Sequence, residues 1–361
     1  MPRQAGTTRP AARRSRDSSP CSSDSGRSQA REGAHAEHDG LAKVAQPPAT
    51  VGEAARELGE VIASGGPAVL LCDGDLDGVL CAVGCLFLAR AQGVGVRVER
   101  AEGQQPRIGD RCVECTAEAD DARAAFAMRV FRGYAAAVGL HGSHGRSGTL
   151  SRSQSTLLRH LALACASDEP TMPQTVSDYL LMGFSDGPVS RELISDPRVA
   201  ALDGLVRYST NECEHVRQFL RFSAMGDGSF GASFRPSADV LPFVGAHFAS
   251  RMRGERFYVV DPTHGTVLLH EEGAGACAVV SVDSPTATRI ADPTGIAEDE
   301  RYVRAMWKRF YDGMALQGRG KAERGYDLRA HWMRKRFWER LTELDPRSDD
   351  PGDSVPARYS G

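Results

Sequence analysis

The spacing of apolar and polar positions predicts helices and strands along most of the chain. Apolar residues recur every three or four positions, as in amphipathic helices, at 51–62, 79–91, 120–138, 157–166, 176–184, 199–222, 239–252, 298–316 and 327–344. Short apolar or alternating runs, which are typical of strands, lie at 68–72, 94–98, 229–234, 257–260, 266–270 and 276–282. Because these elements do not alternate regularly, we expect an α+β fold with a small, largely antiparallel sheet.

Turn-forming residues separate these elements. Asp261-Pro262-Thr263-His264-Gly265 joins two strand-like runs and predicts a β-hairpin with a tight loop. Residues 107–118 carry no sustained pattern and predict a loop, and the Gly/Ser/His-rich stretch 139–148 predicts a surface loop.

The two ends of the chain are polar. Residues 1–48 contain almost no large apolar side chain, so burial cannot offset the entropy of ordering them. We therefore expect a disordered tail at 1–48, a single α+β domain at 49–344 and a second disordered tail at 345–361.

Composition excludes some classes of protein. No apolar run is long enough to span a membrane, and the N-terminus lacks the apolar region of a signal peptide. The nine cysteines are an odd number and several lie in apolar runs, which indicates buried free thiols in a reducing compartment. We expect a cytoplasmic protein that does not associate with membranes.

Positive charge is concentrated near the C-terminus, although the whole chain has a formal net charge of -3. Between Arg301 and Arg340, twelve Lys and Arg face four Asp and Glu, and all three tryptophans lie in the same segment. Cations that neutralise phosphates, beside aromatic rings that stack on bases, favour a nucleic-acid-binding module at 298–344. The candidate contact residues are Trp307, Lys308, Arg309, Arg319, Lys321, Lys335, Arg336 and Trp338. The alternative is that aromatics at helical spacing pack a core.

Three aspartates follow the apolar run 68–72, in Asp73-Gly-Asp75-Leu-Asp77-Gly78. A calcium loop would need a carboxylate at its twelfth position, which is Gly84. The stretch from Asp75 also resembles the first motif of haloacid-dehalogenase-type phosphatases, which implies Asp75 as nucleophile and Asp77 as general acid. That family also uses a downstream lysine, and this chain has none between Lys43 and Lys308.

His247 is a polar residue in an apolar setting and is the further catalytic candidate. An enzyme that acts on DNA or on a phosphoester could bring it together with Asp73, Asp75 and Asp77.

No spacing predicts a metal or cofactor site. Cys112-Val-Glu-Cys115 is a single CxxC, and although His141 and His144 are near in sequence, no second pair lies at zinc spacing. No Walker loop, dinucleotide fingerprint or Ser/His/Asp order is present. We therefore expect neither a metal nor a cofactor.

The chain resembles a bacterial family of DNA metabolism or repair proteins that is also called domain of unknown function 4130. Four stretches carry this resemblance in order, within 67–344: Cys72–Ala82, Glu214–Phe222, Asp239–Phe248 with Arg256–Asp261, and Tyr302–Glu343. The chain departs from the family pattern at Arg334, where proline is usual, and at Gly318–Lys321, which lacks an expected asparagine.

The resemblance implies a working partner. Family members are typically encoded beside a radical-SAM protein, and a similar domain is fused ahead of uracil-DNA-glycosylase-like domains. This sequence has no glycosylase domain and no CxxxCxxC motif. The leading hypothesis is therefore an accessory DNA-binding protein that acts with such a partner in bacterial DNA repair. The enzyme above, and a scaffold that holds the partner without contacting DNA, remain the alternatives.

Overall fold

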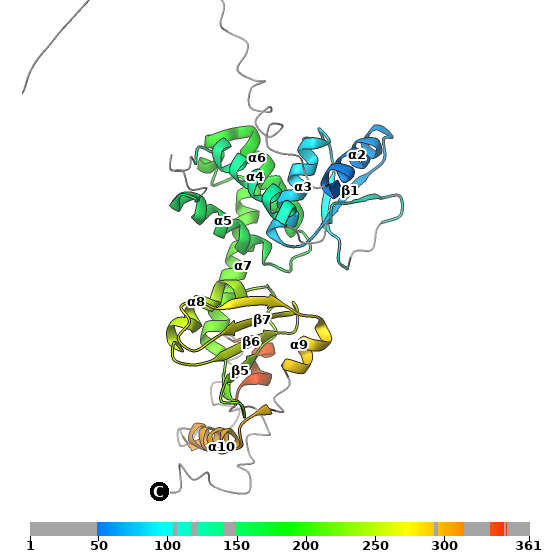
Figure 1. The fold of residues 1–361 in the computed structure, drawn as a ribbon. Coiled ribbons are helices and arrows are strands. Elements are labelled where there is room, and N and C mark those ends of the chain that lie inside the picture. The colour runs from blue at the N-terminus through cyan, green and yellow to red at the C-terminus, as the bar shows by residue number, and fades with distance from the viewer. Residues whose placement is uncertain are drawn as a thin grey trace, which may run out of the picture. The chain divides into compact units, whose positions relative to one another are not determined.

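The computed structural model of the chain describes residues 49–103, 107–116, 121–140, 149–291, 295–313, 333–342 and 344 (Figure 1). Its helices are α2 (Ala49–Ala63), α3 (Leu76–Leu88), α4 (Asp121–Ala137), α5 (Arg152–Cys165), α6 (Met172–Asp186), α7 (Pro197–Phe219), α8 (Leu241–Arg251), α9 (Ser284–Ile290) and α10 (Glu298–Gly313), with 3-10 helices η1 (Gly187–Glu192) and η4 (Lys335–Arg340). Its strands form two sheets, so the predicted α+β class is confirmed.

The first sheet is wholly parallel. Strand β1 (Ala68–Cys72) lies between β2 (Arg97–Arg100) and β3 (Arg111–Glu114) and runs parallel to both. All five side chains of β1 are buried, as expected of a central strand covered on both faces.

This sheet corrects the prediction of one largely antiparallel sheet. Strand β3 lies inside the stretch 107–118 that was predicted to be a loop. Only Val113 of this strand is buried, between Cys112 and the exposed Glu114. A single buried position leaves no periodic signal in the sequence, and pairing with β1 defines the strand instead.

The helix that follows β1 begins earlier than the apolar pattern predicts. Asp75 adopts an extended conformation as the N-cap of α3, and its Oδ1 accepts a hydrogen bond of 2.6 Å from the Gly78 N–H. The side chain of Asp75 thus satisfies one of the free N–H groups at the helix start.

The second sheet contains β4 (Ser223–Ala224), β5 (Phe230–Ser233), β6 (Phe257–Asp261), β7 (Thr266–His270) and β8 (Ala278–Ser281), in that spatial order. Only β5 and β6 pair in parallel. The predicted hairpin is confirmed, because β6 and β7 pair antiparallel with Asp261 opposite Thr266.

The hydrophobic core beside this sheet is formed by residues that are far apart in the sequence. Val244 and Phe248 of α8 are buried in one cluster with Phe257 of β6 and Leu268 of β7. Phe337 of η4 joins the same cluster and is only 4% exposed.

The prediction of an α-helix at 327–344 is wrong for the residues of this range that the structure describes. Residues 335–340 form the 3-10 helix η4, and the preceding Arg334 is extended, with φ −61° and ψ 140°. A 3-10 turn allows Phe337 to pack beside Phe219 of α7 and His215.

None of the helices in the described ranges is both long and apolar enough to cross a lipid bilayer. The predicted tails, 1–48 and 345–361, lie outside the described residues, so those domain boundaries stay predictions.

Candidate functional site

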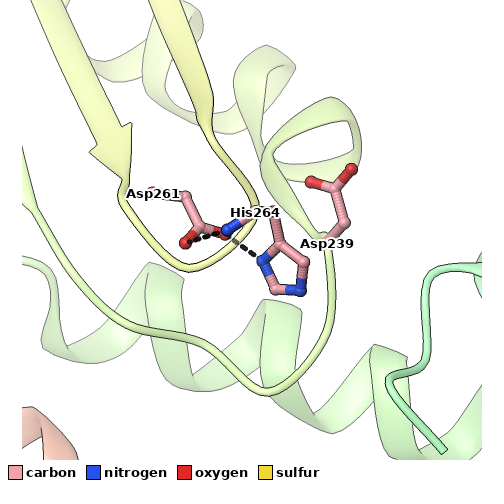
Figure 2. Close-up of side chains that lie close together, drawn as sticks. All are labelled: Asp239, Asp261 and His264. Atoms are coloured by element: carbon pink, nitrogen blue, oxygen red, sulfur yellow. Dashed lines mark hydrogen bonds and ion pairs between the residues drawn. The ribbon is translucent and has the colours of Figure 1, made fainter. Parts of the chain in front are cut away.

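Four polar side chains meet beside the second sheet, and we call them the His264 cluster. Asp261 ends β6, and His264 lies in the turn between β6 and β7 (Figure 2). Asp239 precedes α8, and Asp168 lies in the turn between α5 and α6. These residues come from three turns that are far apart in the sequence.

Backbone contacts hold two of these turns together. Ser167 and Ala238 form an isolated antiparallel bridge. The N–H of Asp239 also donates a hydrogen bond of 2.8 Å to the carbonyl of Ala166. Asp168 and Asp239 are therefore neighbours because of tertiary pairing, although 71 positions separate them.

Asp261 shapes the turn that carries His264. Its side chain is fully buried, and Oδ1 accepts the N–H groups of Thr263 at 2.9 Å and His264 at 3.3 Å. Its Oδ2 lies 2.5 Å from Nδ1 of His264 (Figure 2). The turn also needs Gly265, whose φ is +63° and where a Cβ would lie 2.6 Å from the carbonyl of Val282.

His264 is held between two carboxylates, because its Nε2 lies 2.9 Å from Oδ1 of Asp168. Burial lowers the pKa of His264, but the hydrogen bonds and negative charges of Asp168 and Asp261 outweigh burial and bring this pKa to about 10. Without another cation, the ring is therefore an imidazolium at neutral pH and donates from both nitrogens.

Asp239 completes the cluster. Burial raises the pKa of its carboxyl group, with His264 opposing and Asp261 and Asp168 adding to the rise. Its Oδ1 is buried and has no hydrogen bond within the described part of the chain. One possible ligand atom from each of Asp239, Asp261 and His264 lies within 4.8 Å of the others.

The three aspartates of the sequence motif lie at the carboxyl end of β1, where open parallel sheets form ligand sites. Arg123 of α4 is buried beside them, with Nη2 2.5 Å from Oδ2 of Asp73 and 3.1 Å from Oδ1 of Asp75. Burial raises the pKa of both Asp73 and Asp77, against the opposing charge of Arg123.

Arg100 links this loop to the turn of the His264 cluster. Its guanidinium lies against Gly74, where any Cβ would contact it, and Nη2 donates to the carbonyl of Ser167. Burial and then the charge of Asp75 raise the pKa of the Cys165 thiol at the end of α5. Arg100 therefore contacts both the loop of the three aspartates and the turn that carries Asp168.

His247 is not part of this neighbourhood. It lies on α8, where burial and the charges of Arg217 and Arg251 lower its pKa. Within the described residues no hydrogen bond or ion pair joins His247 to Asp73, Asp75 or Asp77, whereas His264 lies between two carboxylates.

Helix α10 presents an exposed aromatic pair. The rings of Trp307 and Phe310 are 45% and 57% exposed, with centroids 5.8 Å apart. Arg309 is exposed and Lys308 is partly buried on the same helix. Arg319 and Lys321 lie outside the described residues.

The candidate nucleic-acid contacts on η4 differ in exposure and in their partners within the protein. Lys335 is exposed, whereas Arg336 forms an ion pair with the buried Glu212 of α7. Trp338 is partly buried and donates a hydrogen bond of 3.2 Å from Nε1 to the carbonyl of Met333. The pairing of Arg336 gives it a structural role, and its contact with phosphate stays a prediction.

The two cysteines of the CxxC pair differ in their exposure to solvent. Cys112 is partly exposed on β3, whereas Cys115 is buried, and the nearby His141 and His144 lie outside the described residues. Among the described cysteines none forms a disulfide, in agreement with the predicted free thiols.

Sequence reasoning missed the His264 cluster, because its residues share no local spacing. The available signal was a carboxylate and a histidine three positions apart in one tight turn, which we interpreted only as a hairpin loop.

One part of the chain matches a known family. Residues 170–343 match the family described as a domain of unknown function (DUF4130). This range contains three of the four resembling stretches and leaves out Cys72–Ala82. No curated protein and no solved structure is detectably similar to the chain. Residues 170–343 of this chain are therefore similar to the DUF4130 family.

Proposed function

We propose that this protein is an accessory nucleic-acid-binding protein of DNA metabolism, and that it contacts nucleic acid through α10 and the basic segment that follows. The observation that carries the proposal is the exposure of Trp307 and Phe310 beside Arg309. If these aromatics only packed a core, they would be buried like Phe337.

The chemistry of this surface fits a single strand with exposed bases. The aromatic rings supply faces on which bases stack, whichever the base. Lys308 and Arg309 lie next to the rings in sequence, and the segment Arg301–Arg340 has twelve cations against four anions. Electrostatic attraction of this kind contributes affinity without sequence specificity.

We infer that an accessory protein of this kind acts with an enzyme. Given the resemblance described above, we infer a radical-SAM protein or a uracil-DNA-glycosylase-like protein as the partner. The family match itself names no partner and no reaction.

The proposal is tested by titrating the full chain into fluorescent single-stranded and double-stranded DNA at two salt concentrations. We expect binding that weakens steeply with salt and is tighter for the single strand. Absence of binding at low salt would contradict the proposal and favour the protein scaffold.

A second candidate function is a DNA- or phosphoester-directed enzyme. It is favoured by the position of Asp73, Asp75 and Asp77 at the carboxyl end of a central parallel strand, beside a buried arginine. Burial raises the pKa of Asp77, which suits a group that exchanges protons. Turnover that survives in Asp77→Asn would reject this candidate, whereas its loss with unchanged DNA affinity would support it.

A further inference from the structure

Helix α8 has one face open to solvent, and the helix carries no acidic residue. Its buried residues are Leu241, Val244, Gly245, Phe248 and Ala249. Phe243, His247 and Arg251 are spaced four positions apart, so they form a stripe along another side of the helix, where each is partly or fully exposed. The other exposed positions on α8 have small side chains, Pro242, Ala246 and Ser250. The stripe is therefore open to a large anion.

Two arginines from neighbouring helices contact Phe243. Helix α7 packs against both α5 and α8 (Figure 1). The guanidinium carbon of Arg159, on α5, lies 5.4 Å from the centroid of the Phe243 ring. Nη2 of Arg217, on α7, donates a hydrogen bond of 3.1 Å to the carbonyl of Phe243. With Arg251 at the end of α8, three helices each contribute one arginine beside the stripe.

These arginines keep donors available for an anion. A guanidinium that stacks on an aromatic face leaves the N–H groups at its edge free, and their planar arrangement matches phosphate oxygens. Arg159 and Arg251 are exposed, and neither forms an ion pair with any residue that the structure describes. Nε of Arg217 is buried and has no hydrogen bond within the same residues.

Positive charge gathers around His247 and is only partly balanced. Burial, and then the charges of Arg217 and Arg251, lower the pKa of His247. Glu214 opposes them, and its Oε1 pairs with Nη1 of Arg217 at 2.5 Å. Three arginines minus this one glutamate leave two net positive charges. Like charges held close together attract an anionic partner, which relieves their repulsion.

The length of the stripe fits a row of phosphates better than one small anion. Phe243 and Arg251 are eight residues apart, which corresponds to about 12 Å along a helix. One strand of duplex DNA carries a phosphate roughly every 3.4 Å along its axis. The stripe is therefore long enough to follow several phosphates of one strand.

We propose that Phe243, His247 and Arg251, with Arg159 and Arg217, form a second contact surface for the phosphodiester backbone of nucleic acid. We call these five residues the α8 surface. The inference rests on the proposed function and adds to it, because α10 offers rings on which bases stack, whereas the α8 surface offers mainly positive charge.

The first test measures the salt dependence of single-stranded DNA binding by the full chain with Arg159→Ala/Arg251→Ala. Both side chains are exposed, so this variant should fold, and α10 is unchanged in it. We expect the slope of log K against log salt to decrease by roughly 1.4, at about 0.7 per phosphate contact on a single strand. Arg56→Ala/Arg207→Ala removes the same charge from exposed positions on α2 and α7 and should leave the slope unchanged.

The outcomes separate this inference from the proposed function. A slope equal to that of the wild type in the α8 variant, with DNA binding intact, would overturn this inference alone. A reduced slope there, with no effect of substitutions on α10, would support the α8 surface and contradict the contact through α10. A wild-type chain that binds no DNA at low salt would overturn both.

A second measurement uses the wild-type chain and needs no variant to fold. Phenylglyoxal modifies exposed arginines, and peptide mass mapping with and without a saturating thymidine oligonucleotide identifies those that the strand protects. We expect slower modification of Arg159 and Arg251 and an unchanged rate at Arg207, which is exposed on α7. Equal rates at Arg159 and Arg251 with and without the strand would overturn the proposal. Protection by a phosphorylated peptide but not by DNA would also overturn it, in favour of a phosphoprotein partner.

Discussion

Trp307 and Phe310 lie three residues apart on α10, with ring planes tilted by 35° and centroids 5.8 Å apart. Both rings are about half exposed, so solvent reaches an aromatic surface on an amphipathic helix. Single exposed apolar residues are common on proteins, but adjacent aromatics beside cations are typical of surfaces that bind single strands.

Removal of either ring should weaken single-stranded DNA binding and leave its salt dependence unchanged. Stacking contributes about 1–3 kcal/mol per base, so we expect Trp307→Ala to raise the Kd roughly 5-fold to 150-fold. Fluorescence anisotropy at constant salt measures this change. Met306→Ala is the matched control, because Met306 is 42% exposed on the same helix but cannot stack. Equal losses in both variants would contradict a stacking role.

Arg336→Ala should destabilise the fold. Glu212 is 2% exposed and would lose its guanidinium partner, which leaves the His215 ring, 3.5 Å away, and the Ser237 N–H as its remaining polar neighbours. Because Arg336 is 25% exposed, we expect a loss of about 2 kcal/mol in the free energy of unfolding, below the range for fully buried pairs.

Urea denaturation measures that loss, and Lys335→Ala is its neighbouring control. Lys335 is exposed, so its removal should change stability by less than about 0.5 kcal/mol. Equal stability of the two variants would show that the Arg336–Glu212 pair contributes nothing.

The protein should lose the stabilising contribution of His264 at high pH. The pKa is about 10 in the folded state and about 6.5 when unfolded, so the stabilisation is complete below pH 6.5 and is lost as the pH rises through 10. The difference in unfolding free energy between wild type and His264→Gln should shrink steadily from pH 6 to pH 10. A difference that is constant across this range would contradict the paired imidazolium.

The buried thiols should resist alkylation. Burial, and then the nearby Cys115, raise the pKa of Cys81 to about 12, and its side chain is fully buried. At pH 8, iodoacetamide should therefore modify the partly exposed Cys112 and Cys277 before Cys81, because only the thiolate reacts. Peptide mass mapping measures the order, and equally fast labelling of Cys81 in folded protein would contradict it.

Local patterns in the sequence predicted the elements whose signal is local. The run Ala68–Cys72 indicated a buried strand, and the turn at Pro262–Gly265 defined a hairpin whose register the structure confirms. Strand β3 was not predicted, because it has a single buried side chain and is defined by its pairing with β1.

The candidate site depended more strongly on tertiary structure. The bridge between Ser167 and Ala238, which no sequence spacing reveals, brings together the segments of Asp168 and Asp239, and Asp168 in turn lies 2.9 Å from Nε2 of His264. Sequence reasoning chose His247 from its apolar setting, but an apolar setting does not indicate which charged groups a histidine faces. The exposure of Trp307 was likewise not predictable, because helical spacing fits both a buried and an exposed stripe.

The most direct test of the central claim is the salt dependence of DNA binding in Lys308→Ala/Arg309→Ala. If both cations contact phosphates, the slope of log K against log salt should decrease by roughly 1.4–1.8, at about 0.7–0.9 per contact. Arg56→Ala/Arg207→Ala removes the same charge from exposed positions on α2 and α7 and should leave the slope unchanged. A slope equal to that of the wild type in the α10 variant would contradict the account.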